Sequence, residues 1–125
     1  MQPFSEWYQS KNIDPDKTWL ILGKGPSFSK RDEYDLSRFN TLSLNHVVRE
    51  QPVMVAHMID YEVIDACGEA IEKNAEVLVM PWVPHVNGAR GTQNLSELLE
   101  GNAILRRMER LQRLLWYNLS APFYD

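Results

Sequence analysis

The hydrophobic residues of the chain gather in short runs that are separated by glycine, proline and polar residues. Four runs have the length of strands, and the first of them has the almost wholly apolar character of a strand that is buried on both faces of a parallel sheet. The four runs cover residues 18–22, 41–44, 53–58 and 76–80. The first run ends at a glycine, and the third follows the breaker Gln51-Pro52. We therefore predict a short, mostly parallel sheet of about four strands.

Stretches with helical spacing lie between and after these runs. Residues 59–74 repeat apolar side chains on one face despite Gly68, and a brief helix is expected over residues 29–36. Ser96 is expected to cap a last helical region, in which an apolar stripe runs from residue 104 to 115. Because strands and helices alternate, the pattern predicts a three-layer, Rossmann-like α/β sandwich.

The length of the chain limits how many such units it contains. With 125 residues it is long enough for one compact domain and too short for two ordinary ones. We predict a single Rossmann-like domain over residues 1–125, with residues 1–17 as an N-terminal extension. Residues 81–92 are rich in proline, glycine and asparagine and show no periodicity, which predicts a long surface loop.

Composition excludes several classes of partner. The chain has 13 basic and 17 acidic residues, a net charge of −4, which gives no overall attraction to nucleic acid or to an anionic membrane. Cys67 is the single cysteine, the first residues lack the pattern of a signal peptide, and no apolar run is long enough to cross a bilayer. We expect a cytoplasmic protein with no membrane span and no nucleic-acid partner. Whether it forms a homo-oligomer or works with a partner chain stays open.

Polar segments directly follow all four predicted strands. These segments are residues 23–27, 45–46, 58–60 and 81–87. In open parallel sheets, ligands bind beyond the carboxyl ends of the strands. We therefore expect the four segments to converge on one edge of the sheet and to form the functional site there.

The turn Gly23-Lys24-Gly25-Pro26-Ser27 carries the clearest chemical signal. Its glycines permit a tight turn and let backbone amides approach an anion, and Ser27 can cap a helix or donate to a phosphate oxygen. The third glycine of a dinucleotide fingerprint is replaced by Phe28, and the spacing of a Walker A loop is missing. The turn therefore predicts a phosphate-bearing ligand and disfavours NAD binding and ATP hydrolysis. The alternative is a plain strand-to-helix turn that needs small residues.

Three segments together resemble a known pattern. The turn at residues 23–27, the segment Asn40-Thr41-Leu42-Ser43-Leu44-Asn45-His46-Val47 and the segment Met58-Ile59-Asp60-Tyr61-Glu62-Val63-Ile64-Asp65 are similar to those of bacterial sialyltransferase-like and motility-associated glycosyltransferase-like proteins. The resemblance covers about the first half of the chain. It implies that Gly23, Gly25, Ser27 and Asn45 contact the phosphates of a nucleotide-activated sugar, and that Asp60 is the aspartate after the third strand.

The resemblance has a second branch and one departure. Archaeal pterin diphosphokinases have a similar turn, so the pattern implies a nucleotide more firmly than a sugar. The sialyltransferase-like proteins usually have asparagine where this chain has Lys24. The longer, cationic side chain of Lys24 either reaches a phosphate itself or points into water.

Two further residues are candidates for chemistry. His85 lies in the loop after the last predicted strand, where a neutral imidazole can deprotonate an acceptor hydroxyl; the alternative is an ordinary loop residue. Asp60 either bonds a ribose or caps the helix that follows it. His46 and His57 are interpreted as a loop and a strand residue. The three histidines and Cys67 have no metal-ligand spacing, so no metal site is predicted.

The leading hypothesis is a glycosyltransferase-like protein that binds a nucleotide-sugar donor at this edge. Beyond that donor substrate, the sequence specifies no cofactor. A non-catalytic module that binds a nucleotide or phosphate is the first alternative. Pyrophosphoryl transfer of the pterin-diphosphokinase kind is the second.

Overall fold

The computed structural model describes residues 1–25, 28–87 and 93–118. Six strands form one sheet in the order β1-β6-β5-β4-β3-β2, and every neighbouring pair is parallel. The strands are β1 (Gln2–Pro3), β2 (Trp19–Leu22), β3 (Asn40–Leu44), β4 (Val53–His57), β5 (Ala75–Pro81) and β6 (Leu114–Tyr117). The predicted α/β class and the parallel sheet are therefore confirmed.

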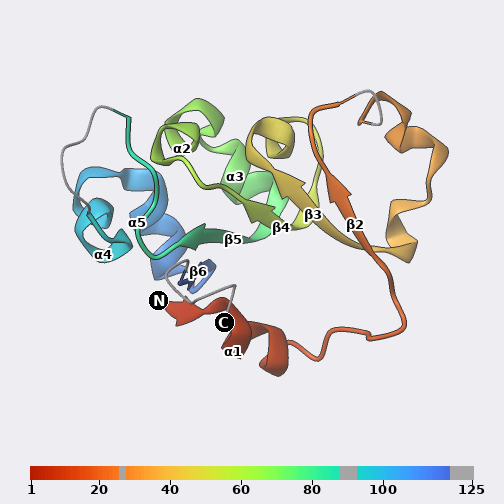
Figure 1. The fold of residues 1–125 in the computed structure, drawn as a ribbon, viewed down its shortest axis with the longest axis horizontal. Coiled ribbons are helices and arrows are strands. Elements are labelled where there is room, and N and C mark those ends of the chain that lie inside the picture. The colour runs from red at the N-terminus through yellow and green to blue at the C-terminus, as the bar shows by residue number, and fades with distance from the viewer. Residues whose placement is uncertain (26–27, 88–92, 119–125) are drawn as a thin grey trace, which may run out of the picture.

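Short helices connect the strands and lie on both faces of the sheet (Figure 1). The α-helices are α1 (Phe4–Ser10), α2 (Tyr61–Cys67), α3 (Ala70–Asn74), α4 (Leu95–Leu98) and α5 (Ala103–Arg110). The 3₁₀ helices are η1 (Phe28–Glu33), η2 (Leu36–Arg38), η3 (Asn45–Arg49) and η4 (Leu99–Gly101). No helix in these parts of the chain is long and apolar enough to span a membrane.

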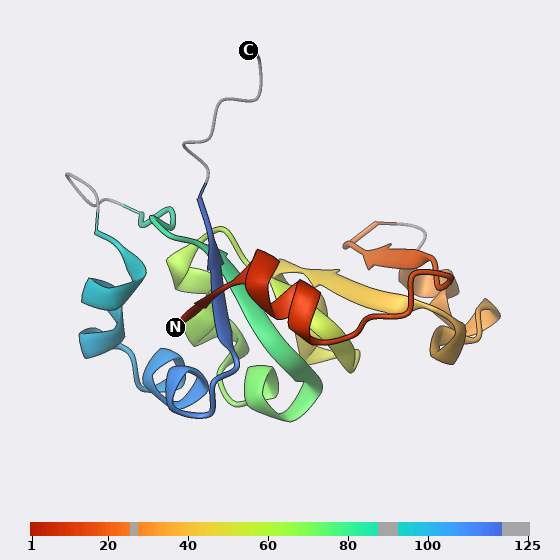
Figure 2. The same ribbon diagram turned by 90° about the horizontal axis from the view of Figure 1, so that it is seen from below.

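The strand order explains which helices share a face. From β2 to β6, each strand is added on the same side of the one before it. Crossovers between parallel strands are right-handed. Connections that proceed across the sheet in one direction therefore lie on one face, and a connection that runs back across the sheet lies on the other face. The return connection runs from β1, beside β6, to β2 at the far edge, and it carries α1 (Figure 2).

Each face has its own hydrophobic core. The larger core lies between the sheet and the helices after β3; Ile64, Leu78, Met80 and Leu105 are fully buried in it. The smaller core lies on the α1 face, where Trp7 packs with apolar residues of β4, β5 and β6. Burial of such large side chains contributes about 1.5–3 kcal/mol each.

The sheet is larger than predicted, with six strands instead of about four. Residues 114–117 form β6, although the sequence placed Leu115 at the end of a helical stripe. Residues 1–17, expected as an extension, contribute the edge strand β1 and helix α1. Leu105 and Met108 are the buried residues of α5, while Leu111, beyond its end, is exposed.

The predicted helices are shorter than expected. The stretch 59–74 is divided into α2 and α3 at Gly68, whose φ of 56° lies in the left-handed region that ends helices. The stretch 29–36 forms the 3₁₀ helix η1 and the start of η2 instead of an α-helix. Asn94, not Ser96, caps α4 through a capping box with Glu97.

Candidate functional site

The carboxyl ends of β2, β3, β4 and β5 are neighbours along one edge of the sheet, which we call the carboxyl edge. The register pairs Leu22 with Ser43, Leu44 with His57, and His57 with Val79. Three spacings of about 4.8 Å separate the outer two of these strands, so the edge is roughly 14 Å wide there. The four polar segments that follow these strands therefore begin side by side, as the sequence predicted.

The turn after β2 does not present its amides as expected. The Gly25 amide donates to the carbonyl of Gly23 at 3.1 Å, and the Phe28 amide donates to the carbonyl of Gly25 at 2.9 Å. These two N–H groups are therefore used within the turn. A 3₁₀ helix follows the turn, so the dipole of a regular α-helix is not available to an anion. Pro26 and Ser27 lie outside the described residues.

A small hollow of about 260 Å³ opens beside this turn. It is lined by Lys24, His46, Arg49 and Glu50. Among the described residues, no hydrogen bond or ion pair is made by the side chains of Lys24, His46 or Arg49. Two cations and an imidazole with unused hydrogen-bonding capacity thus face one hollow at the carboxyl edge. We call this hollow the basic hollow, and Lys24, His46 and Arg49 its three basic residues.

Helix η3 places two of these residues. Asn45 begins η3 with a φ of 53°, a left-handed conformation that asparagine tolerates better than most residues. Val47 and Val48 of η3 are completely buried in the larger core, so the helix is fixed against the sheet. Asn45 is exposed and lies at the end of β3, where it was predicted. Its conformation turns the chain from β3 into η3.

The cations of the basic hollow act on a buried thiol. Cys67 of α2 is buried, and burial raises the pKa of its thiol. The positive charges of Arg49 and Lys24 partly oppose this rise. Residues from the β2 turn, η3 and α2 are therefore close enough for their charges to interact, on the face of the sheet that carries α2.

Asp60 and His85, which the sequence singled out separately, are paired. The His85 Nδ1 atom lies 2.8 Å from the Asp60 Oδ1 atom. Their backbones form an isolated parallel bridge, in which the Tyr61 amide donates to the His85 carbonyl and the His85 amide donates to the Ile59 carbonyl. Asp60 precedes α2 but makes no side-chain cap bond to it. Of the two roles considered for Asp60, the capping role is therefore not seen, and its carboxylate contacts His85 instead.

The contact with Asp60 determines which ring nitrogen of a neutral His85 carries the proton. A carboxylate only accepts hydrogen bonds, so a neutral His85 ring carries its proton on Nδ1 and keeps a lone pair on Nε2. The His85 side chain is 60% exposed, so Nε2 is open to solvent and to a ligand. A histidine oriented by a carboxylate is an arrangement that serves as a general base in many enzymes.

The segment that carries His85 is anchored on both sides of that residue. The Trp82 amide donates to the Tyr117 carbonyl at 2.7 Å, and the Trp82 and Trp116 rings lie 5.0 Å apart. The Asn87 amide donates to the Glu62 carboxylate. The described part of the predicted 81–92 loop is therefore held against β6 and α2.

A second histidine pair was missed by the sequence. His57 Nε2 and the Tyr117 hydroxyl lie 2.6 Å apart on the α1 side of the sheet. Burial lowers the pKa of His57 and raises the pKa of Tyr117, which favours the neutral form of both groups. No local signal links residues 60 positions apart, and the contact requires β6, which the pattern had assigned to a helix.

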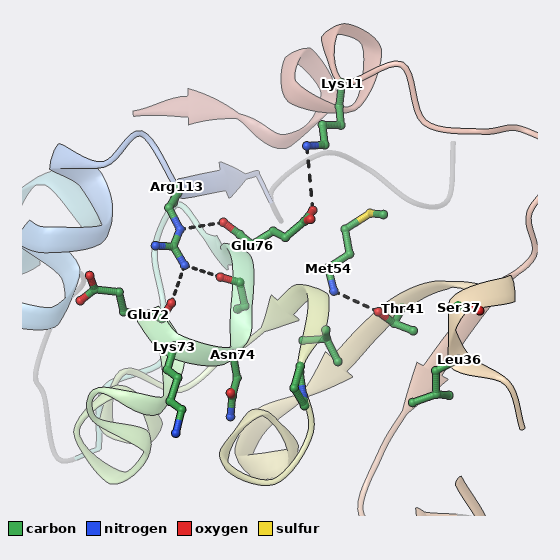
Figure 3. A pocket seen from close by; sticks show the side chains of 13 residues that line it. Lys11, Leu36, Ser37, Thr41, Met54, Glu72, Lys73, Asn74, Glu76 and Arg113 are labelled. Carbon is green, nitrogen blue, oxygen red and sulfur yellow. Dashed lines mark hydrogen bonds and ion pairs between the residues drawn. The ribbon is translucent and has the colours of Figure 1, made fainter. Parts of the chain in front are cut away.

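A larger hollow, of about 810 Å³, lies at the opposite, amino edge of the sheet (Figure 3). Most of its polar side chains are already engaged within the fold: Arg113 donates to the carbonyls of Glu72, Ala75 and Glu76, and Lys11 pairs with Glu76. Size alone therefore favours the amino edge, whereas unused hydrogen-bonding capacity favours the carboxyl edge. We place the candidate site at the carboxyl edge, because chemistry requires groups that the fold itself does not use.

No family model, curated protein or solved structure matches the chain. Within residues 1–25, 28–87 and 93–118, no group of three or more histidine, cysteine, aspartate or glutamate side chains is arranged to hold a metal ion. The geometry of the carboxyl edge is therefore the structural basis for a proposal about function.

Proposed function

We propose that the protein binds a nucleotide-activated sugar at the carboxyl edge and transfers the sugar to an acceptor hydroxyl. The observation that carries this proposal is the basic hollow, in which Lys24, His46 and Arg49 face one space without a described side-chain partner. It lies at the edge where parallel sheets of the Rossmann-like kind bind ligands. The resemblance of residues 23–27 and 40–47 to glycosyltransferase-like proteins supports the same class of ligand.

The phosphate would be bound mainly by side chains. Lys24 and Arg49 supply positive charge, and charge-assisted hydrogen bonds to phosphate oxygens are about twice as strong as neutral ones. The amides of Gly25 and Phe28 are used within the turn, so they contribute less than the sequence suggested. Lys24, the residue that departs from the family pattern, thereby takes a direct part in binding.

The Asp60–His85 pair supplies the base for transfer. His85 Nε2 takes the proton of the acceptor hydroxyl while the oxygen of that hydroxyl attacks the anomeric carbon of the sugar. The bond from that carbon to the phosphate oxygen breaks, and its electron pair leaves with the nucleotide. Lys24 and Arg49 stabilise the negative charge on the departing phosphate. Asp60 keeps the ring oriented and stabilises the imidazolium that forms.

A non-catalytic phosphate-binding module is the second candidate. The exposure of His85 favours it, because water has free access to a base that protrudes from the surface. In that case the basic hollow binds the nucleotide, and the Asp60–His85 contact only fixes the segment after β5.

Thermal shifts with CMP, UDP, GDP and ATP, each with and without magnesium, test ligand binding. A ligand that binds only the folded state at 100 times its dissociation constant stabilises it by about 2.7 kcal/mol. We expect one nucleotide to raise the melting temperature, and Lys24→Ala or Arg49→Ala to reduce that rise. Lys30→Ala, an exposed cation of η1, is the matched control. Equal shifts in all variants would contradict the site.

Transfer assays then distinguish an enzyme from a module. With a nucleotide sugar that binds, His85→Ala should abolish transfer or donor hydrolysis and leave nucleotide affinity unchanged. Asp60→Asn should reduce turnover less, because the asparagine oxygen can still accept the bond from His85 Nδ1 but carries no charge to stabilise the imidazolium. Binding without any turnover in the wild type would favour the module, and magnesium-dependent pyrophosphoryl transfer would favour the diphosphokinase alternative.

A further inference from the structure

The amino edge of the sheet carries a groove that the proposed function does not use. Six segments line it: the end of α1, η2, the residue before β6, and the starts of β3, β4 and β5 with the adjoining end of α3. Its volume of about 810 Å³ lies within the range of small-molecule sites in proteins. A neighbouring hollow of about 730 Å³ shares Glu72, Lys73, Asn74 and Arg113 with it, so the two are continuous along α3.

The groove has an apolar floor. Leu36, Pro52, Val53, Met54 and Ala75 contribute to its lining, and Figure 3 shows Met54 between the α1 side and the η2 side. Met54 is partly exposed, although it lies in a strand that is otherwise mostly buried. An unbranched methionine adapts its shape to a bound group. The floor therefore favours a ligand with an apolar body.

The charges around the groove favour an anion. Five cations and three carboxylates line the groove and the neighbouring hollow, in a chain whose net charge is −4. Two of the carboxylates are already paired: Glu76 with Lys11 at 4.0 Å, and Glu72 with Arg107 at 2.7 Å. A positive concavity on a negative protein attracts anions.

Of the three cations that line the groove itself, Lys73 is the one that remains for a ligand; Arg49, which also has no described side-chain partner, lines only the neighbouring hollow of the two. Within the described ranges, the Lys73 ammonium makes no ion pair or hydrogen bond, whereas Arg113 is engaged with three carbonyls. Lys73 lines both hollows, and Figure 3 shows its side chain beside that of Asn74 and directed away from Met54. Its long stem lets the ammonium move to meet an anionic group in the groove.

We propose that the amino-edge groove is a second binding site, for a small amphipathic anion whose head is held by Lys73 and whose apolar body lies on Met54. The head is a phosphate or a carboxylate. Among the described residues, the groove itself shares no lining residue with the basic hollow, although Arg49 lines both the basic hollow and the hollow beside the groove. Of these three hollows, Lys24 and His46 line the basic hollow alone, so variants of Lys24 and Lys73 distinguish the two sites.

Methyl NMR of the protein labelled at its methionine methyl groups tests this site, with Met54→Leu to assign the signal. Phenyl phosphate, benzoate, inorganic phosphate and benzyl alcohol are the probes. We expect phenyl phosphate or benzoate to shift the Met54 methyl signal saturably, and inorganic phosphate and benzyl alcohol to bind more weakly. Met58, Met80 and Met108 are fully buried and serve as internal references. An unmoved Met54 signal, or equal effects of benzyl alcohol and the anions, would overturn the proposal.

Variants separate this site from the carboxyl edge. Lys73→Ala should raise the dissociation constant for the effective anion about tenfold, and Lys73→Arg should restore it. Lys24→Ala should leave the Met54 titration unchanged, even if it removes nucleotide binding. Loss of the Met54 shift in Lys24→Ala but not in Lys73→Ala would place the anion elsewhere and overturn the proposal.

Discussion

The two edges of the same sheet use similar polar residues in different ways. At the amino edge, most of these residues are already engaged within the fold, through bonds to the backbone or through ion pairs. Arg113 donates to three carbonyls around the start of β5, and the Asn74 side chain donates to the Val48 carbonyl at 2.8 Å. Asn40, 2% exposed, donates to carbonyls of the segment that precedes β2. These side chains hold the segments between the strands in place by hydrogen bonds to backbone carbonyls.

At the carboxyl edge, several polar residues have hydrogen-bonding capacity that the fold does not use. Lys24, His46 and Arg49 line a hollow without described side-chain partners, and the Asp60–His85 contact leaves one imidazole nitrogen open. Removing a group that bonds the backbone should cost stability, whereas removing a group with unused capacity should cost binding. The comparison therefore predicts opposite results for variants at the two edges.

The largest effect is expected at Arg113. Arg113→Ala leaves three carbonyls near α3 and β5 without their donor, and should lower the free energy of unfolding by about 2–3 kcal/mol. Urea denaturation measures this. Arg110→Ala, at an exposed position on α5, is the matched control and should change stability by less than about 0.5 kcal/mol. Equal effects of the two substitutions would remove the structural role of Arg113.

A pair of asparagines compares the edges directly. Asn74→Ala should cost about 1 kcal/mol, because the Val48 carbonyl loses a partner. Asn45→Gly should cost less than about 0.5 kcal/mol, because glycine accepts the left-handed conformation of Asn45 at no steric cost. Chemical denaturation measures both changes. A larger loss in Asn45→Gly than in Asn74→Ala would reverse the comparison.

His57 predicts a dependence on pH. Burial lowers its pKa in the folded state, so the unfolded chain takes up the proton first as the pH falls. The stability that neutral His57 contributes is present above its ordinary pKa of about 6.5 and is lost progressively below it. The free energy of unfolding should fall more between pH 7.5 and 5.5 in the wild type than in His57→Gln, which still accepts a bond from Tyr117. The same decline in both proteins would show that His57 is not the responsible group.

The smallest change in stability is expected at the functional candidates. Lys24→Ala and Asp60→Asn should each alter the free energy of unfolding by less than about 0.5 kcal/mol, because exposed charges and surface ion pairs contribute little. Denaturation midpoints measured beside those of Asn74→Ala test this. A loss above 1 kcal/mol in either variant would assign that residue to the fold.

The sequence predicted the parts of the fold that have a local signal. The apolar runs located β2 to β5, and the parallel arrangement brought the segments after them to one edge. β1 has only two residues and Leu114–Tyr117 continues a helical stripe, so both were missed. The division at Gly68 follows from one left-handed residue inside a pattern that otherwise has helical spacing.

The candidate site was predicted only in part. Lys24, Asn45, Asp60 and His85 lie where expected, because strand ends determine their place. The inward bonds of the Gly25 and Phe28 amides, and the place of Arg49 in the basic hollow, depend on the 3₁₀ geometry of η1 and η3. That geometry has no sequence signature comparable with the capping signals of α-helices.

The central claim is that the carboxyl edge is the one that binds the phosphate of a nucleotide. Backbone amide NMR during a titration with the nucleotide that stabilises the protein most tests it directly. We predict that the signals of Lys24, His46 and Arg49 move together with one dissociation constant, while Lys73 and Asn74 stay unchanged. Shifts confined to Lys73 and Asn74, or no saturable shift at the three residues of the basic hollow, would contradict the account.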